Sequence, residues 1–382
     1  MRSLAVASVL LALVAACRSR AQPEAQEAGA STAAMTSADA GAPAKSADAP
    51  PPKPGMAWIP AGTLRAGTPP ERIPRVADEE LPGLPVEMGG FYIDLYPWPN
   101  EPGAIPTSNV TRDEAEALCA SKGKRLCTEL EWERACKGPE NTTYEYGDAY
   151  RSATCGTGMP AEQAARRPSG ENAQCKSAFG VSDMHGIVFE WTSSSWGRGA
   201  KDPSLGVLRG GNAKVGELAG RCANGIARAP SKKAPTMGLR CCAGAKNEAE
   251  VKMKLEGTPG LAPATNDLAA TWADELVTVV GANVNAKTIR AWSWTPVANE
   301  DLVVVQGCGD AVPRSCGLIV GRTRNGKRYV GASAVVGRDP ADVARSGDAR
   351  HLRFRALDVR GTFSREITYV YGRVELGEMK RP

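Results

Sequence analysis

The residues best suited to chemistry in this 382-residue chain are its eleven cysteines, which far outnumber its two histidines. Ten cysteines remain if Cys17 is modified, and an even number in an exported protein is typical of a disulfide framework. A structural zinc site would need short Cys-x2-Cys pairs, whereas Cys119, Cys127 and Cys136 are separated by seven and eight residues. We therefore expect disulfides rather than structural zinc.

One stretch, which contains Cys127, predicts the local structure that would position these cysteines. Gly123–Arg134 reads GKRLCTELEWER. Thr128 followed by Glu131 has the spacing of a capping box, which predicts that a helix begins there. Trp132 lies on the same helix, and its large ring requires a core in which to be buried.

The N-terminal residues predict export and lipid anchoring. Arg2 precedes the short apolar run Leu4–Ala16, which is typical of a signal peptide and too short to span a bilayer. The run ends at Cys17 in a sequence that resembles a lipoprotein cleavage box, although an ordinary cleavage near Ala16 or Ala21 is the alternative. Residue 18 is not the aspartate that retains lipoproteins in the inner membrane of many bacteria. We therefore expect the protein to be anchored in the outer membrane.

Composition and charge limit the other partners. Residues 18–54 are rich in Ala, Pro, Ser and acidic residues and show no apolar periodicity, which predicts a disordered tether. The tether follows the expected signal peptide at residues 1–16 and the lipidated Cys17. The formal net charge of +5 is small for this length and predicts no nucleic-acid partner. The expected partners are the membrane, through the lipid, and an envelope protein or glycan.

A series of motifs extends the GKRLCTELEWER stretch into a family resemblance. The stretch is similar to the GKRLPTEAEWE signature of the formylglycine-generating-enzyme family, also called sulfatase-modifying factors, with Cys127 in place of proline. Further blocks follow the family's order: Met56–Gly62, Gly90–Pro97, Asn109–Cys119, Phe179–Trp191, Leu208–Gly211 and Gly238–Cys241. The resemblance covers residues 55–244.

The resemblance implies a fold for residues 55–244: α+β, with little regular structure and a twisted C-type-lectin-like core stapled by disulfides. It also implies the bonds Cys119–Cys241 and Cys136–Cys222. The two extra cysteines beside those motifs favour Cys127–Cys242. Among the remaining cysteines we expect Cys155–Cys175 and a local bond, Cys308–Cys316.

The family's catalytic thiolates are missing. The resemblance places two copper-binding cysteines between the Arg-Gly-Gly block and Cys222, but residues 212–221 read NAKVGELAGR. None of these side chains can replace a thiolate as a ligand for copper. We therefore expect no copper and no formylglycine-generating activity. The candidate residues for contacting a ligand in the cleft are Trp196, Arg198, Arg209, Glu217 and Arg228. For the three arginines, buried salt bridges are the alternative role.

A structural calcium ion is the cofactor that the resemblance implies. Asp183 and Glu190 lie seven residues apart around a glycine turn, and calcium prefers carboxylate and carbonyl oxygens. The family's loop assigns the ligands to Asp183, the carbonyls of Gly186 and Val188, and Glu190. A tight turn with Glu190 paired to an arginine is the alternative.

The C-terminal region resembles no family that we recognise. Residues 245–267 are polar and rich in Gly and Pro, which predicts a linker, and residues 268–382 predict a mostly antiparallel β domain. Its expected strands are residues 275–280, 288–294, 302–306, 317–323, 327–336, 352–359 and 366–374. Asn325-Gly326 predicts a hairpin turn.

Two functions fit these expectations. The first is a non-catalytic envelope lipoprotein whose sulfatase-modifying-factor-like domain binds a ligand or a protein. The second is an envelope enzyme whose chemistry is unrelated to cysteine oxidation. Convergent carboxylates would favour the enzyme, and an open groove lined by aromatic and arginine side chains would favour binding.

Overall fold

The computed structural model describes residues 50–160, 167–198, 204–253 and 255–382. The expected signal peptide, Cys17 and the tether up to residue 49 lie outside the described residues. The described residues form one compact unit. Among the described residues, no helix is long and apolar enough to cross a membrane.

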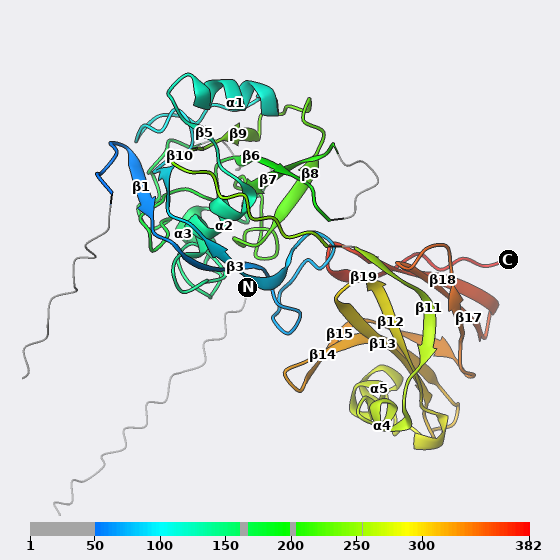
Figure 1. Ribbon diagram of the computed structural model, residues 1–382. Coiled ribbons are helices and arrows are strands. Elements are labelled where there is room, and N and C mark those ends of the chain that lie inside the picture. The colour runs from blue at the N-terminus through cyan, green and yellow to red at the C-terminus, as the bar shows by residue number, and fades with distance from the viewer. Residues whose placement is uncertain (1–49, 161–166, 199–203, 254) are drawn as a thin grey trace, which may run out of the picture. The chain divides into compact units, whose positions relative to one another are not determined.

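Residues 55–244 form small sheets joined by long loops (Figure 1). One sheet has the strand order β1-β4-β10-β5, a second has the order β8-β7-β6-β9, and β2 pairs with β3. The strands are β1 Met56–Ile59, β2 Gly62–Gly67, β3 Pro82–Met88, β4 Phe91–Asp94, β5 Arg125–Leu126, β6 Phe189–Ser195, β7 Gly206–Gly210, β8 Gly225–Arg228, β9 Met237–Leu239 and β10 Cys241–Ala243.

The helices of this domain begin at side-chain caps. In α1, Arg112–Ala120, Thr111 and Glu114 form a reciprocal capping box. In α2, Glu129–Lys137, Thr128 and Glu131 form the predicted one, and every residue of the helix is buried. The short α3 covers Ser152–Cys155. The predicted start of α2 is therefore confirmed.

Five disulfides join these elements, and they are the five pairs that the sequence led us to expect. Four lie within the domain and one lies in the C-terminal region: Cys119–Cys241, Cys127–Cys242, Cys136–Cys222, Cys155–Cys175 and Cys308–Cys316. Cys241 and Cys242 are neighbours on β10, so two of the bonds hold that strand to the α1–α2 segment.

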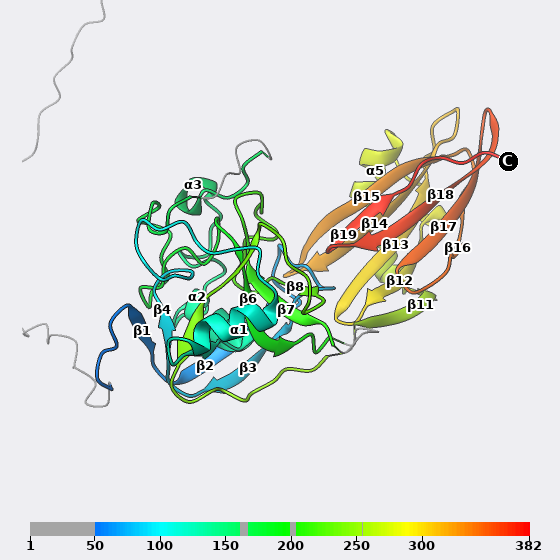
Figure 2. The same ribbon diagram turned by 90° about the horizontal axis from the view of Figure 1, so that it is seen from above.

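The C-terminal region has three layers (Figures 1 and 2). A five-stranded antiparallel sheet, β11 to β15, packs against a four-stranded antiparallel sheet, β16 to β19, through residues such as Trp294 and Phe354. Trp272 and Leu276 pack on the opposite face of the larger sheet. The elements are β11 Glu256–Pro263, α4 Asn266–Ala270, α5 Ala273–Val280, the 3-10 helix η2 Ala286–Thr288, β12 Arg290–Val297, β13 Glu300–Cys308, β14 Cys316–Arg324, β15 Lys327–Gly337, β16 Asp342–Arg345, β17 His351–Asp358, β18 Gly361–Val370 and β19 Arg373–Leu376.

The structure corrects two expectations for this region. Residues 275–280 belong to α5 rather than to a strand, because Trp272 and Leu276 bury one helical face on β13 and β14. The expected linker contains β11, which pairs with β12 as the first strand of the larger sheet. By contrast, the predicted hairpin at Asn325-Gly326 is confirmed, since it joins β14 to β15 with positive φ at both residues.

Candidate functional site

The centre of the sulfatase-modifying-factor-like domain is a buried network of charges on α2. Glu129 accepts hydrogen bonds from Arg198 (2.8 Å) and Arg209 (2.7 Å), and Glu133 accepts one from Arg209 (3.0 Å). Lys137 pairs with Glu133 at 2.8 Å. The helix places the two carboxylates four residues apart, so one guanidinium reaches both.

These ion pairs explain why the buried Glu129 carboxylate and the buried Arg209 guanidinium stay charged. Burial alone would raise the pKa of Glu129, but the charges of Arg198 and Arg209 hold that pKa below its ordinary value. Burial would lower the pKa of Arg209, but Glu133 and Glu129 raise it above its ordinary value. The network therefore keeps its charges inside the domain.

This network corrects three of the five candidate cleft residues. Arg198 and Arg209 have no exposed surface, and Trp196 is buried with its ring 4.0 Å from the Arg198 guanidinium carbon. All three are structural, and the two arginines form the buried salt bridges that were their alternative role. Glu217 and Arg228 are exposed. Of the five, Glu217 is the one that lines a groove described below.

The loop expected to hold calcium has other partners in the structure. Both oxygens of Glu190 accept hydrogen bonds from Arg240, at 2.9 and 3.0 Å, and Trp132 donates to the same carboxylate at 2.6 Å. Asp183 accepts the Gly170 amide hydrogen at 2.6 Å.

A carbonyl of the same loop is also occupied. Arg167 donates to the Gly186 carbonyl at 3.1 Å. Guanidinium groups therefore occupy two of the four expected ligand groups, those of Glu190 and Gly186, and supply the positive charge that calcium would have brought. As the side chains stand, Asp183, Gly186, Val188 and Glu190 do not fit a calcium ion. The pairing of Glu190 with an arginine is the alternative that the sequence left open.

The consequence for calcium can be measured. We expect the melting temperature of the purified protein to be the same with millimolar Ca²⁺ as with chelator, because a ligand adds stability only if it binds the native state. Differential scanning calorimetry is the measurement. A melting temperature that rises with Ca²⁺ in the wild type but not in Asp183→Ala would restore the calcium site.

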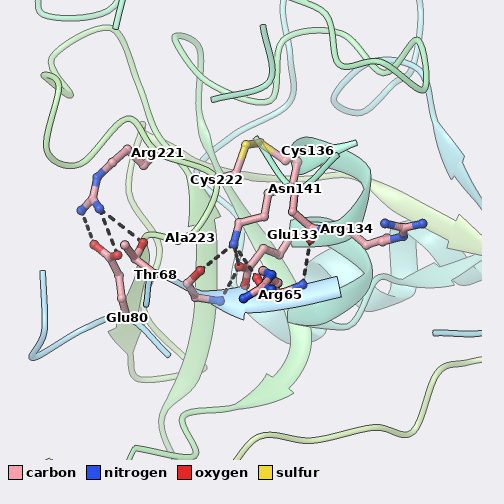
Figure 3. Close-up of polar contacts among 12 residues, drawn as sticks. Arg65, Thr68, Glu80, Glu133, Arg134, Cys136, Asn141, Arg221, Cys222 and Ala223 are labelled. Carbon is pink, nitrogen blue, oxygen red and sulfur yellow. Dashed lines mark hydrogen bonds and ion pairs between the residues drawn. A yellow bond between two sulfur atoms is a disulfide. The ribbon is translucent and has the colours of Figure 1, made fainter. Parts of the chain in front are cut away.

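The segment that would hold the catalytic thiolates lies next to the network. Residues 212–221 contain no cysteine, and all ten cysteines among the described residues are in disulfides. Arg221 is the last residue of the segment. Its guanidinium is paired with the Glu80 carboxylate and donates to the Pro74 carbonyl at 2.5 Å. Figure 3 shows this pair near the Cys136–Cys222 disulfide.

A groove of about 920 Å³ opens beside this segment. It is lined by three parts of the chain: residues 73–79, residues 216–224, and side chains of the C-terminal sheets. The polar and aromatic side chains of the last group are Tyr329, Tyr371, Arg322, Arg373 and Glu375. Tyr371 is 61% exposed, so its ring is available to a ligand.

Buried contacts fix the first part of the groove. Asp78 accepts hydrogen bonds from the Gly372 amide (3.0 Å) and from Arg350 (3.0 Å), and Ala77 lies in the core of the C-terminal sheets. Arg75 donates to the Asn299 carbonyl at 2.7 Å. No sequence signal predicts this groove, because its walls come from residues far apart in the chain, and neither the region around Asp78 nor the turn at Gly372 carries a recognisable motif.

One carboxyl group in the groove has an altered acidity. Burial raises the pKa of Glu79 to about 7, although a hydrogen bond from Asn224 at 3.2 Å opposes the shift. Glu79 and Glu217 both line the groove. The site therefore offers aromatic rings, guanidinium groups and a carboxyl that is partly protonated near neutral pH.

Comparison with known proteins identifies one of the domains. Residues 99–245 match the family model of the FGE-sulfatase domain, described as the sulfatase-modifying factor enzyme 1-like domain. The expected resemblance is thus confirmed, and this part of the chain carries that domain. The match includes α2 with its ion network and the segment without thiolates.

Curated relatives include a pseudoenzyme and an enzyme. Inactive C-alpha-formylglycine-generating enzyme 2 of Bos taurus is 33% identical over 157 residues, which cover 37% of this chain and 51% of that protein. Hercynine oxygenase of Mycolicibacterium smegmatis is 41% identical over 98 residues, which cover 24% of this chain and 22% of that protein. The chain spans about half the length of these relatives or less.

Among solved structures, PvdO from Pseudomonas aeruginosa is similar to this chain with a TM-score of 0.40 and 21% identity. The similarity covers 49% of this chain and 93% of that one.

Proposed function

We propose that this protein is a non-catalytic envelope lipoprotein whose sulfatase-modifying-factor-like domain binds a partner through the groove between residues 73–79, residues 216–224 and the C-terminal strands. The observation that carries the proposal is the lining of this groove. Two tyrosines and three arginines line it beside residues 216–219. Arg75 and Arg322 are paired with Glu300, so Arg373 is the arginine that is available to a partner. Tyrosine and arginine are the side chains that most often dominate binding energy at interfaces.

The rest of the proposal extends the sequence-based expectations. We infer a C-type-lectin-like core, which the small paired sheets and long loops of residues 55–244 support. We infer export and anchoring at the outer membrane from the N-terminal motif and Cys17. The partner would be an envelope protein or glycan. The bovine relative's description as inactive supports a binding role for a domain of this kind.

The alternative function is an enzyme with different chemistry. One observation favours it: Glu79, whose pKa of about 7 suits a proton donor or acceptor near neutral pH, lies in the same groove as Glu217. The relative named hercynine oxygenase also shows that similar domains occur in enzymes. The tyrosines and arginines that line the groove together with its three carboxylates, Glu79, Glu217 and Glu375, favour binding over catalysis.

Capture of a partner from the protein's own envelope tests the binding role. The intact lipoprotein is cross-linked in its envelope, and the captured species is identified by mass spectrometry. We expect Tyr371→Ala and Arg373→Ala each to reduce capture about tenfold, since loss of an interface anchor typically costs more than 1 kcal/mol. Arg360→Glu, an exposed change outside the groove, is the matched control.

The outcomes separate the two functions. Capture that falls in both groove variants but not in the control supports the groove as the binding site. Equal capture by the wild type and by both groove variants contradicts it. Turnover of a small molecule that is lost in Glu79→Gln would favour the enzyme.

A further inference from the structure

One strand edge of the C-terminal region is open. β15 is the outermost strand of the five-stranded sheet, and within the part of the chain that the structure describes it pairs with β14 alone. The strand is 11 residues long, and residues 329–337 contain no charged side chain and no proline. A strand edge of this length and composition is a ready template for pairing with another strand.

The other three edge strands of the two C-terminal sheets are protected. β11 contains Pro259 and Pro263, and proline cannot donate a hydrogen bond to a neighbouring strand. β16 and β19 are only 4 residues long each. Proline and short length are two of the means by which proteins prevent pairing at sheet edges. β15 is therefore the exception among the four edges.

The register with β14 shows which backbone groups of β15 are free. A two-residue turn follows Arg324, so the first pair of the hairpin is hydrogen-bonded, and bonded and non-bonded pairs alternate from there. Across the two bulges of the strand, Val330, Ser333 and Val335 fall in non-bonded pairs. Their N–H and C=O groups therefore point away from β14, toward the open edge, where no described strand pairs with them.

The open edge leads into the groove. Residues 329–331 at the start of β15 line the groove, and so do residues 373–375 of β19. The two strands are neighbours there, since Gly331 lies against the Val374 side chain (Figure 2). A partner that occupies the groove is thus positioned to continue along the edge of β15.

The groove also restricts the charge of its partner. Three carboxylates line it, those of Glu79, Glu217 and Glu375, beside the one available guanidinium of Arg373. Complementary charge across an interface selects the correct partner and raises the rate of association. A basic segment therefore complements this end of the edge better than an acidic one.

We propose that the partner is a protein, and that it adds an extended basic segment as a further strand to the open edge of β15. Main-chain hydrogen bonds to Val330, Ser333 and Val335 provide affinity, and side-chain contacts in the groove provide specificity. The inference rests on the proposed function, because the edge continues the groove. It selects a protein over a glycan, since a glycan cannot continue the alternating N–H and C=O pattern of a sheet.

Proline substitution in the intact lipoprotein tests the proposal by the envelope capture described above. Ser333→Pro removes an amide hydrogen that points toward the partner and leaves the hydrogen bonds between β14 and β15 in place. We expect capture to fall about tenfold, because an acceptor of the partner is left unpaired. Ser333→Ala, which keeps the amide, is the matched control and should capture like the wild type. Val335→Pro repeats the test at a second outward position.

Hydrogen exchange locates the contact on the strand. The complex is purified in detergent without cross-linking, and its exchange is compared with that of the free protein by mass spectrometry. We expect the outward amides of residues 329–337 to exchange about tenfold more slowly in the complex, because they become hydrogen-bonded. Residues 342–345, the edge strand β16, are the internal control and should not change. The segment of the partner that is cross-linked to this edge should contain lysine or arginine.

Several results would overturn the proposal. They are wild-type capture by both proline variants, unprotected amides in residues 329–337, an acidic partner segment, and a captured species that is a glycan or a second copy of this chain. Unfolding of both proline variants would also overturn it, because the outward amides would then be bonded within the fold.

The same capture experiment separates this proposal from the groove. Capture that falls in Tyr371→Ala but not in Ser333→Pro keeps the groove as the binding site and excludes strand addition. Capture that falls in Ser333→Pro but in neither groove variant keeps the strand edge and contradicts the groove. A wild-type protein that captures nothing contradicts both.

Discussion

Replacing Arg209 by alanine is expected to destabilise the sulfatase-modifying-factor-like domain by about 3–5 kcal/mol. The guanidinium contacts Glu129 and Glu133 and also donates to the Ala223 carbonyl at 2.9 Å. Its removal leaves two buried carboxylates with less positive charge around them. Uncompensated buried charge is among the most costly defects that a single substitution can create.

Denaturant unfolding of the purified protein measures this effect. Arg228→Ala is the matched control, because that arginine is exposed and its guanidinium donates to the neighbouring Ala227 carbonyl rather than to a buried carboxylate. The control should change the unfolding free energy by less than about 0.5 kcal/mol. An Arg209→Ala protein within about 1 kcal/mol of the wild type would show that the network is not a main source of stability.

The second large effect is expected for Cys119→Ser/Cys241→Ser. The bond joins α1 to β10 across 122 residues and is fully buried. In the chain-entropy model a loop of this length contributes about 4–5 kcal/mol, so we expect the variant to unfold at much lower denaturant concentration.

A second disulfide of the same domain provides the control. Cys155→Ser/Cys175→Ser also replaces two buried cysteines, but it opens a loop of only 20 residues. It should cost about 1.5 kcal/mol less, because the entropic contribution grows with the logarithm of loop length. Equal losses in the two variants would mean that local packing rather than loop closure determines the contribution.

Much of the first domain could be predicted because its signals are local or belong to a family. The capping box at Thr128 and Glu131 fixes the start of α2 by contacts within four residues. Three of the cysteine pairs, Cys119–Cys241, Cys136–Cys222 and Cys127–Cys242, followed from the motifs that accompany them. Likewise, Asn325-Gly326 specifies its hairpin by backbone conformation alone.

The incorrect predictions have a common physical cause: contacts between residues that are far apart in the sequence determine the structure at these positions. The β-branched residues of 275–280 favour a strand, but burial of Leu276 against the larger sheet selects a helix. The Gly and Pro of 256–263 suggest a linker, yet an edge strand tolerates them. Arg209 has a structural role because Glu129 and Glu133, which lie 80 and 76 residues away in the sequence, are next to it in space.

The candidate groove could not be predicted for the same reason. Its walls join Glu79, the 216–219 segment and Tyr371, and no single stretch contains two of them. What the sequence did indicate was the missing chemistry, since the absence of cysteine from residues 212–221 is visible directly. The proposed binding role therefore combines a sequence-based exclusion with a structural site.

The central claim, that this domain does not carry out the cysteine chemistry of the family's enzymes, is tested most directly by mass spectrometry of a sulfatase-type cysteine peptide. The full chain is incubated with the peptide, copper, oxygen and a reductant, beside an active formylglycine-generating enzyme as the positive control. We predict an unchanged peptide, because the reaction needs a pair of thiolates that residues 212–221 do not supply. Conversion of the peptide thiol to an aldehyde in proportion to the amount of this protein would contradict the account.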